Sequence, residues 1–502
     1  MARCAMLSNS ERPIDSGTLD RLSSFWTWAA AAFLLVLACF SLVEPVVGLS
    51  LQIPRNYNEG WNAYWATTAI SGGPLYPPLN ALISNNYPPL SFFVVGLFGR
   101  LIGDPILAGR ALALLGFLLV AINIVIWLCR CGVRISLAIA SGAAFIITVD
   151  AMLHVYIAMD DPQWLGHGLM TTGMVILWRN PRSQKRLATA AILMLLGGLF
   201  KHLIIPVPVA LAAWLFISER RAFWKWVSIL GALGVTAFGV IYVVYGHNFV
   251  DDILHAPREI SFLAAVHMGR QVLPNLLPLL CVAAASLPQF NKREPVTFAW
   301  IYLGVATAIG ALAATGAGVS ENAVFDVVIA ASLAAGLALE SLAIAWTANY
   351  RKPTYLKAFI LLPVLAVILW APFSIRLNIE RLRHLAVLAQ ATPSDIELLR
   401  RHDARYAACE SLALCFWSGA PFNVDLFNFG QKLKTGQTPV DVCRQLFDGR
   451  RFTIIQLYWE PGNYPWPLIP HECDRAIADH YEVIRRSING YFLVARTDPT
   501  AS

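Results

Sequence analysis

Acidic residues that could carry out acid–base chemistry occur at three places in the sequence, each near the end of a long apolar stretch. They are Glu59, the adjacent pair Asp160 and Asp161, and Glu321 or Asp326. A positioned carboxylate can remove the proton of a hydroxyl acceptor, or hold a divalent cation against a phosphate. A single acidic loop residue is more often simply solvated, and the adjacent pair could also stabilise the start of the following helix through its dipole. We nevertheless expect Glu59, Asp160 and Asp161 to be catalytic, with Asp160 and Asp161 as the ligands of Mg²⁺ or Mn²⁺ if the protein uses such a cofactor.

Basic residues that could meet a phosphate lie close to the same stretch ends. Lys201 and His202 close one apolar stretch, Arg110 opens another, and Arg258 lies in a short polar segment. A lysine at such a position can simply extend to water, but lysine is otherwise absent from the loops on this side of the topology predicted below. We therefore expect these four residues to bind a phosphate through their charge. Polar and aromatic neighbours complete the expected substrate site: Tyr57, Asn58, Gln163, Glu321 and Asn322.

The elements that must position these residues are membrane helices. Of the 502 residues, 57% are hydrophobic and 14% are charged, against about 25% charged in soluble domains; the mean hydropathy is +0.57. Repeated apolar runs of nearly spanning length indicate a polytopic α-helical membrane protein, so the net charge of +7 does not indicate nucleic-acid binding. We expect about eleven spans, at 25–44, 107–128, 135–150, 163–178, 187–203, 207–217, 226–245, 271–287, 296–314, 327–347 and 358–375.

The distribution of Lys and Arg predicts how these spans are oriented. Seventeen basic residues lie in the tail and in alternate loops, whereas the opposite loops hold five. Because basic residues favour the cytoplasmic side, the tail, 1–24, is expected inside and the carboxyl terminus in the periplasm of a bacterial inner-membrane protein. The transmembrane region, 25–375, then includes an external loop at 45–105. Within this loop, 58–70 and 89–102 are expected to be helices lying along the membrane interface.

Residues 376–502 contain no spanning run and predict a soluble external α/β domain. We expect helices at 377–399 and 438–447, the second with Thr438 as its N-cap, and short β-rich runs at 405–411, 452–458 and 491–496. Four cysteines fall in this region: Cys409, Cys415, Cys443 and Cys473. Disulfides persist outside the cytoplasm, so we expect these cysteines to pair, and three pairings are open.

Several short motifs, taken in order along residues 25–375, resemble one family. Asn85-Asn86-Tyr87-Pro88-Pro89-Leu90, Gly103-Asp104-Pro105 and Gly109-Arg110 follow the acidic aromatic loop, and 318–322 reads Gly-x-Ser-x-Asn. This order is similar to that of the GT-C fold glycosyltransferases, in particular the bacterial branch related to protein mannosyltransferases and the lipid A aminoarabinose transferase. In that branch a first-loop Asp-Glu pair, a second acidic motif and a lysine at a membrane end surround the phosphate of the donor. Glu59, Asp160-Asp161 and Lys201 match these positions in order.

One position departs from the family pattern. Asn58 stands where the resemblance implies the aspartate of the Asp-Glu pair, and an amide cannot accept the proton. Either Glu59 takes over this role, or Asp160 or Asp161 does, or the chain is a divergent or inactive member.

The resemblance implies an inverting glycosyltransferase that moves a hexosyl or pentosyl group from a polyprenyl-phosphate donor. The acceptor would be a glycolipid, polysaccharide or protein on the external face, and no nucleotide or nucleic acid would take part. A carboxylate would take the acceptor's proton, and cations would stabilise the departing phosphate. The main alternative, a transporter or flippase of a lipid-linked glycan, predicts polar residues near the bilayer midplane and repeated halves, and the sequence has neither. A structural or assembly factor would leave the acidic loops unexplained.

Overall fold

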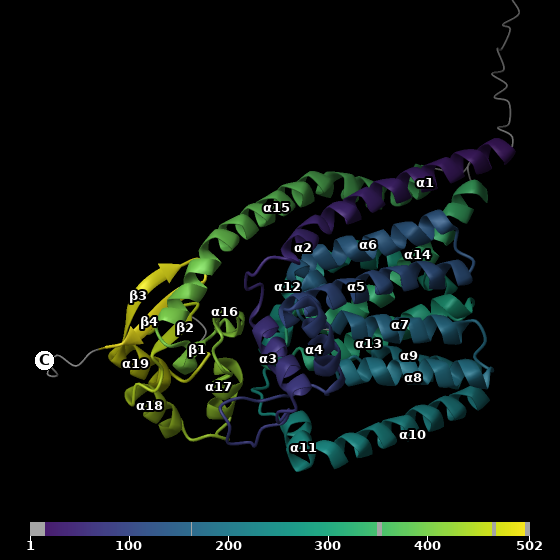
Figure 1. The fold of residues 1–502 in the computed structure, drawn as a ribbon. Coiled ribbons are helices and arrows are strands. Elements are labelled where there is room, and N and C mark those ends of the chain that lie inside the picture. Colours follow the sequence, from purple (N-terminus) through teal and green to yellow (C-terminus); the bar gives the residue numbers. More distant parts are fainter. Residues whose placement is uncertain (1–15, 162, 349–353, 464–467, 497–502) are drawn as a thin grey trace, which may run out of the picture.

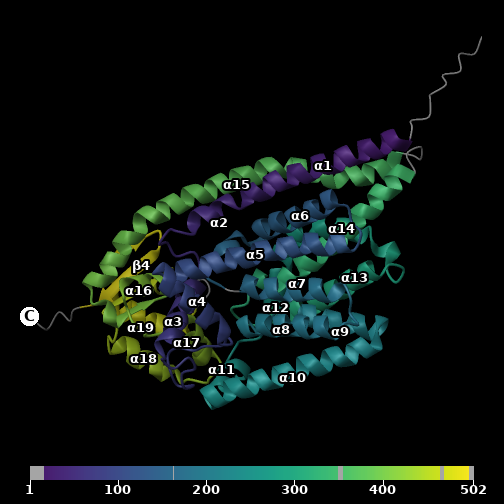
Figure 2. The ribbon, with the colours of Figure 1, turned by 45° about the vertical axis from the view of Figure 1, so that its right-hand side comes forward.

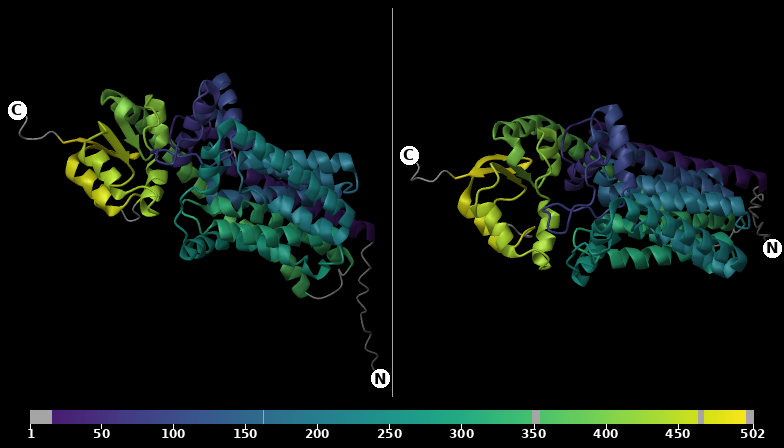
Figure 3. Two further views of the ribbon diagram at one scale, coloured as in Figure 1. Left: turned by 90° about the horizontal axis from the view of Figure 1, so that it is seen from below. Right: turned by 60° about the horizontal axis from the view of Figure 1, so that its bottom comes forward.

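The computed structural model describes residues 16–161, 163–348, 354–463 and 468–496 and is mostly helical (Figure 1). Long helices run side by side in a bundle, and a region with a small sheet, called the end region below, lies at one end of it (Figure 3). The bundle and its connections comprise α1 (Ser16–Ser41), α2 (Val43–Gly48), α3 (Tyr57–Ser71), α4 (Leu90–Ile102), α5 (Pro105–Arg130), α6 (Ile135–Leu153), η1 (His154–Ala158), α7 (Gln163–Trp178), α8 (Gln184–Phe200), α9 (Pro206–Ser218), α10 (Arg220–Tyr245), α11 (His247–Leu254), α12 (Phe262–Ala284), η2 (Leu287–Gln289), α13 (Glu294–Ala313), η3 (Glu321–Val324), α14 (Phe325–Ala348) and α15 (Thr354–Arg401). The end region comprises η4 (Ala404–Tyr406), β1 (Ala407–Cys409), α16 (Leu412–Ser418), α17 (Leu426–Lys434), α18 (Val440–Asp448), β2 (Ile454–Leu457), α19 (His471–His480), β3 (Tyr481–Ser487) and β4 (Gly490–Ala495).

The helices of the bundle make the chain a multi-pass membrane protein. Within the described residues, six helices are long and apolar enough to cross a membrane: Ser24–Gly48, Pro105–Arg130, Ile135–Ala158, Arg220–Tyr245, Glu294–Ala313 and Glu321–Ala345. These six coincide with six of the eleven predicted spans. Helices also occupy the other five predicted positions, but α7, α8 and α9 have only 16, 17 and 13 residues, against about 20 for a typical span. The count of eleven therefore stays a prediction.

The two predicted first-loop helices exist, but one is covered by other parts of the protein and the other exposes apolar side chains. The side chain of Asn56 caps α3 by accepting a hydrogen bond from the backbone N–H of Asn58. Gly60 of α3 lies directly against α16, because a Cβ at this position would come within 2.1 Å of the backbone nitrogen of Ala413. Protein therefore covers α3, which the sequence did not predict. In contrast, α4 exposes Phe93 and Leu101, as a helix at a lipid interface would.

The end region is built on a four-stranded sheet with the order β1-β2-β4-β3. The β1–β2 pair is parallel, and β4 is antiparallel to both β2 and β3. The predicted runs at 405–411, 452–458 and 491–496 contain β1, β2 and β4. Sequence reasoning missed β3, whose buried and less buried residues alternate and which therefore has no apolar run. The core of this region includes Phe429, Phe447, Ile455, Ile477 and Leu493.

Several details of the carboxyl-terminal prediction need correction. Pro439, not Thr438, is the N-cap residue of α18, and no side chain caps this helix. The predicted helix at 377–399 is the last part of α15, a helix of 48 residues, so the predicted domain border falls inside one continuous element. This helix runs beside α1 and reaches the sheet (Figure 2).

The four cysteines of the end region form two disulfides. Cys409 pairs with Cys415, and Cys443 pairs with Cys473. The structure thus selects one of the three pairings that the sequence left open.

Candidate functional site

A cavity of about 430 Å³ lies where the bundle meets the end region. Its wall combines α3, the segment before α4, the ends of α8 and α13, the segment between α11 and α12, and α17. Seven of the twelve predicted site residues line it: Tyr57, Asn58, Gln163, Lys201, His202, Arg258 and Asn322. The five that do not line it are Glu59, Arg110, Asp160, Asp161 and Glu321.

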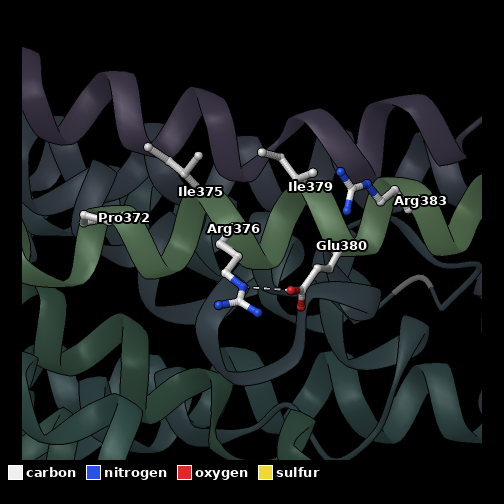
Figure 4. A pocket seen from close by; sticks show the side chains of 6 residues that line it. All are labelled: Pro372, Ile375, Arg376, Ile379, Glu380 and Arg383. Carbon is white, nitrogen blue, oxygen red and sulfur yellow. Dashed lines mark hydrogen bonds and ion pairs between the residues drawn. The ribbon is translucent and has the colours of Figure 1, made fainter.

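A second hollow, of about 540 Å³, lies on the surface of α15 (Figure 4). It is lined by Pro372, Ile375, Arg376, Ile379, Glu380 and Arg383. Its ion pair joins Arg376 to Glu380 at 2.9 Å between exposed side chains, where such a pair contributes little. No predicted site residue lines this hollow, so the first cavity is the candidate site.

Lys201 carries the positive charge at the centre of the cavity wall. It follows the last residue of α8, and its ammonium donates to Asp161 Oδ2 at 3.1 Å and to Gln163 Oε1 at 2.8 Å. The ammonium also lies 4.7 Å from the ring centre of Tyr87, which favours a cation. Since the Lys201 side chain is only 7% exposed, the Asp161 carboxylate is the partner that makes a buried charge tolerable there.

Glu59 and Arg110 are paired with each other behind the cavity wall. Arg110 Nε and Nη2 donate to the two Glu59 oxygens at 2.7 and 2.8 Å, and both side chains are fully buried. The remaining guanidinium N–H groups donate to the carbonyls of Gly48, Leu51 and Ile53. All five donors of an arginine are thereby used. Arg110 therefore has no free N–H group with which to bind the phosphate of a sugar donor, contrary to the prediction from the sequence.

Asp160 is buried next to this pair and faces away from the cavity. Its backbone N–H donates to Glu59 at 3.2 Å, and its side chain lies against Gly109, where a Cβ would come within 1.7 Å of Asp160 Oδ1. This close approach explains the glycine that precedes Arg110. Among the described residues, neither Asp160 oxygen has a hydrogen-bond partner. Burial, together with the nearby carboxylates of Glu59 and Asp161, raises the pKa of Asp160 well above its usual value, against the opposing charge of Arg110.

The two predicted metal ligands, Asp160 and Asp161, have different surroundings, and metal binding by this pair stays a prediction. Asp161 accepts from Lys201 through one oxygen and from the backbone N–H of Gln163 through the other, while the Asp160 oxygens lie against Gly109. The two carboxylates therefore have different neighbours. Within the part of the chain that the structure describes, no three His, Cys, Asp or Glu side chains are grouped as metal ligands would be.

Two amide side chains cross-link the cavity wall. Gln163 Oε1 accepts from Asn322 Nδ2 at 2.9 Å as well as from Lys201, and Gln163 Nε2 donates to the Asn322 carbonyl at 3.1 Å. Gln163 Nε2 also lies 3.2 Å from Nε2 of His167. His167 in turn faces Asp326, with 3.7 Å between its Nδ1 and Oδ2 of the carboxylate. Of the two acidic residues that the sequence offers near α14, the structure places Asp326, not Glu321, in the cavity wall.

Among the described residues of the end region, Phe427 of α17 lines the cavity, and no sequence pattern predicted it. The guanidinium of Arg258 lies 5.3 Å from its ring centre, and the Tyr57 ring lies 5.6 Å away. Gly318, whose φ is +80°, allows this ring to approach, because a Cβ there would come within 2.3 Å of Phe427. Lys432 fixes α17 by donating to carbonyls of the first loop, including that of Ala81 at 2.8 Å.

Comparison with known proteins adds the fold. No family model and no curated protein sequence matches the chain. Among solved structures, ArnT from Cupriavidus metallidurans in the apo state is similar, with a TM-score of 0.60, 16% identity, and coverage of 93% of this chain and 98% of that one. The same protein bound to undecaprenyl phosphate has a TM-score of 0.57 and 14% identity, and the match covers 94% of this chain and 99% of that one. An oligosaccharyltransferase from Archaeoglobus fulgidus in the apo form has a TM-score of 0.51 and 10% identity, and the match covers 95% of this chain and 75% of that one.

These similar structures are GT-C fold glycosyltransferases, and the likeness extends over nearly the whole chain. The resemblance seen in the sequence is thus confirmed at the level of architecture. The chain has the GT-C fold.

Proposed function

We propose that this protein is an inverting glycosyltransferase that moves a sugar from a polyprenyl-phosphate donor to an acceptor on the external face of the membrane. The observation that carries the proposal is a cavity at the end of the bundle in which Lys201 and Arg258 lie beside aromatic and amide side chains. The GT-C fold supports it. So does the similar ArnT structure, which holds undecaprenyl phosphate.

The cavity combines the two chemical characters that a lipid phosphate needs. Lys201 and Arg258 offer positive charge to a phosphate, and His202 lies beside Lys201. Another part of the wall is apolar and includes Ile309 and Leu312 from the end of α13. A headgroup bound by the cations would leave its hydrocarbon chain beside this apolar part.

The remaining predicted substrate residues fit the sugar portion of the donor. Tyr57, Asn58 and Asn322 present an aromatic ring and two amides to the cavity. Aromatic rings and amides are common partners for the faces and hydroxyls of a polar ligand in a mostly apolar pocket. Glu59 and Arg110 support these residues from behind by fixing the start of α3 against α5.

The proposal includes the predicted topology, with eleven spans, the amino terminus inside and the carboxyl terminus outside. Reporter fusions should then place Arg182 in the cytoplasm and Ser502 outside. A cytoplasmic carboxyl terminus would put the cavity on the wrong side and refute the external acceptor.

The transporter or flippase alternative fits the site less well. Transporters bind their substrates near the bilayer midplane. Here Gln163 begins α7, Lys201 follows α8, and Asn322 lies in η3, the short helix that leads directly into α14, so these wall residues lie at helix ends.

The function is tested by undecaprenyl phosphate binding together with mass analysis of envelope glycolipids and glycoproteins from cells with and without the gene. We expect one species to lose a sugar when the gene is deleted. Lys201→Ala should weaken undecaprenyl phosphate binding roughly tenfold or more, since a hydrogen bond to a charged group contributes about 1.5–3 kcal/mol. No change in any envelope species, with no binding of the lipid phosphate, would refute the proposal.

Two control variants separate phosphate binding from a general loss of structure. Lys185→Ala removes an exposed lysine from the other end of the same helix and should leave binding unchanged. Asp161→Asn removes the counter-ion that keeps the buried Lys201 charged and should weaken binding, but less than Lys201→Ala does, because the arriving phosphate can itself favour the charged ammonium. If Asp161→Asn weakened binding as much as Lys201→Ala, the pair would be structural.

A further inference from the structure

We infer that Asp326 takes the proton from the acceptor hydroxyl, an inference that rests on the proposed transferase function. The reaction needs a carboxylate that can touch the acceptor inside the cavity. Among the described residues that line the cavity, Asp326 is the one acidic side chain.

The other acidic candidates near the cavity do not line it, and other groups hold or surround them. Glu59 accepts four hydrogen bonds, two from Arg110 and two from the backbone N–H groups of Arg55 and Asp160. Asp161 is the counter-ion of Lys201. Asp160 lies outside the cavity wall, and its side chain lies against Gly109. None of the three lines the cavity, so none can touch an acceptor hydroxyl inside it.

A chain of hydrogen bonds orients the groups around Asp326. Lys201 can only donate, so the oxygen of Gln163 must face it and the NH₂ group of Gln163 must face His167. His167 Nε2 is therefore an acceptor, and the neutral imidazole carries its proton on Nδ1. This nitrogen is buried, has no hydrogen-bond partner among the described residues, and points toward Asp326 Oδ2 at 3.7 Å. Tyr302 donates to Oδ1 at 2.5 Å.

Asp326 thus faces two groups with N–H or O–H donors, which favour its ionised form, whereas the burial of its side chain opposes that form. A carboxylate that lines the cavity is what a general base requires, and contacts to such a base often tighten only when substrate is bound. The helix position offers another explanation, because Asp326 lies in the first turn of α14, where the helix dipole favours an acid. The experiment below separates these two roles.

The position of Asp326 also suits an inverting displacement. Gln163 lies between Lys201 on one side and His167 with Asp326 on the other. The acceptor oxygen would attack the anomeric carbon from the Asp326 side and form the new C–O bond. The C–O bond to the phosphate would break on the cation side, its electron pair leaving with the polyprenyl phosphate. The acceptor's proton would pass to Asp326.

The test compares transfer and lipid binding in Asp326→Asn, which keeps the size of the side chain and can still accept from Tyr302. Transfer is measured in isolated membranes as the rate at which the modified envelope species appears in mass spectra. Binding is measured on purified protein with undecaprenyl phosphate as the probe. We expect the rate to fall roughly 100-fold or more and binding to stay within twofold. In Asp326→Ala membranes, added formate should restore part of the rate, because formate can replace a missing carboxylate base but not a helix-stabilising residue.

The matched control is Glu340→Gln. Glu340 is also a buried carboxylate of α14, but it pairs with Arg134 far from the cavity, so its removal should change the transfer rate less than threefold. A wild-type rate in Asp326→Asn, with Lys201→Ala still impaired, would overturn the inference and leave the transferase function standing. Lost lipid binding in Asp326→Asn without formate rescue would also overturn it, as the sign of a structural role. A wild-type protein that modifies no envelope species would overturn both.

Discussion

Replacing Glu59 with glutamine distinguishes what the sequence predicts for this residue from what the structure shows. As a catalytic base, Glu59 could lose its charge with little effect on folding, and turnover alone would fall about 100-fold. In the structure, Glu59 is instead the only carboxylate within ion-pair distance of Arg110 among the described residues, and both side chains are fully buried. The change would leave the Arg110 guanidinium as a buried charge without a counter-ion.

The size of the effect follows from that burial. Removing one partner of a buried ion pair costs about 3–5 kcal/mol, because the other charge stays desolvated. Since about 1.4 kcal/mol is a tenfold change, the folded population would fall by roughly two to four powers of ten relative to the unfolded one. The three backbone carbonyls that also accept from Arg110 would soften this loss without supplying a negative charge.

The assay is thermal unfolding of the purified protein in detergent, followed by size-exclusion chromatography at each temperature. Glu59→Gln should unfold at a clearly lower temperature than wild type. Adding Arg110→Met to it should recover part of the stability, because the unpaired charge is then gone. Glu321→Gln removes a partly exposed acid outside the cavity wall and serves as the control without effect. An unchanged unfolding temperature for Glu59→Gln, together with lost transfer, would refute the structural role and restore Glu59 as the base.

Three further outcomes are expected. Gly318→Ala should impair lipid binding, because the added Cβ would displace the ring of Phe427 and would strain a backbone with φ of +80°. In the control Gly316→Ala, the added Cβ meets only ordinary contacts at 3.5 Å or more, so this variant should bind the lipid normally. Opening the Cys443–Cys473 disulfide should cost about 1.4 kcal/mol more, on loop entropy alone, than opening the other one, because the sequence separations are 30 and 6; denaturation of the two Cys→Ser pairs would check this, and equal costs would contradict it. Burial raises the pKa of Asp252 from 3.8 to about 7, so wild-type stability should decrease as the pH rises from about 4 to about 7 through this group. Asp252→Asn should therefore unfold at a higher temperature than wild type at pH 8 but not at pH 4, and a gain of equal size at both pH values would argue against the titration.

The parts of the fold that the sequence could predict are those set by local patterns. Apolar runs located the six long spans. Asn56 and Asp104, with acceptor side chains just before α3 and α5, show why those helices begin where they do. The edge strand β3 lacks such a pattern. In Tyr481–Ser487 every residue after Tyr481 is at least partly exposed, and the strand contains charged residues, so a search for apolar runs does not find it.

For the site, too, the sequence predicted some features, whereas others depend on tertiary structure. Most of the residues that were predicted from residue type and order do share the cavity wall, among them Lys201, Gln163 and Asn322. They could not show which charges are neutralised by one another, because Glu59 and Arg110 are 51 positions apart and their pairing depends on how α3 packs on α5. Phe427 lies still farther from Tyr57 along the chain. Only tertiary structure brings such residues together. Residue type alone therefore could not show which of the charged residues pair with each other and which line the cavity.

The way in which the charges are paired suggests why the proposed phosphate site needs Asp161. All five N–H groups of the Arg110 side chain donate to protein acceptors, so this charge stabilises the packing of the helices and is not available to a ligand. Lys201 has a looser partnership, a single contact of 3.1 Å with one oxygen of Asp161. A buried lysine without any counter-ion would tend to lose its proton, and a neutral amine would not attract a phosphate. Asp161 keeps the ammonium charged while the cavity is empty, and an arriving phosphate can replace one carboxylate oxygen at little cost because both are anionic acceptors. In the proposed reaction, the acid next to the lysine therefore maintains the charge that the departing phosphate requires, and proton transfer is left to a carboxylate on the other side of Gln163.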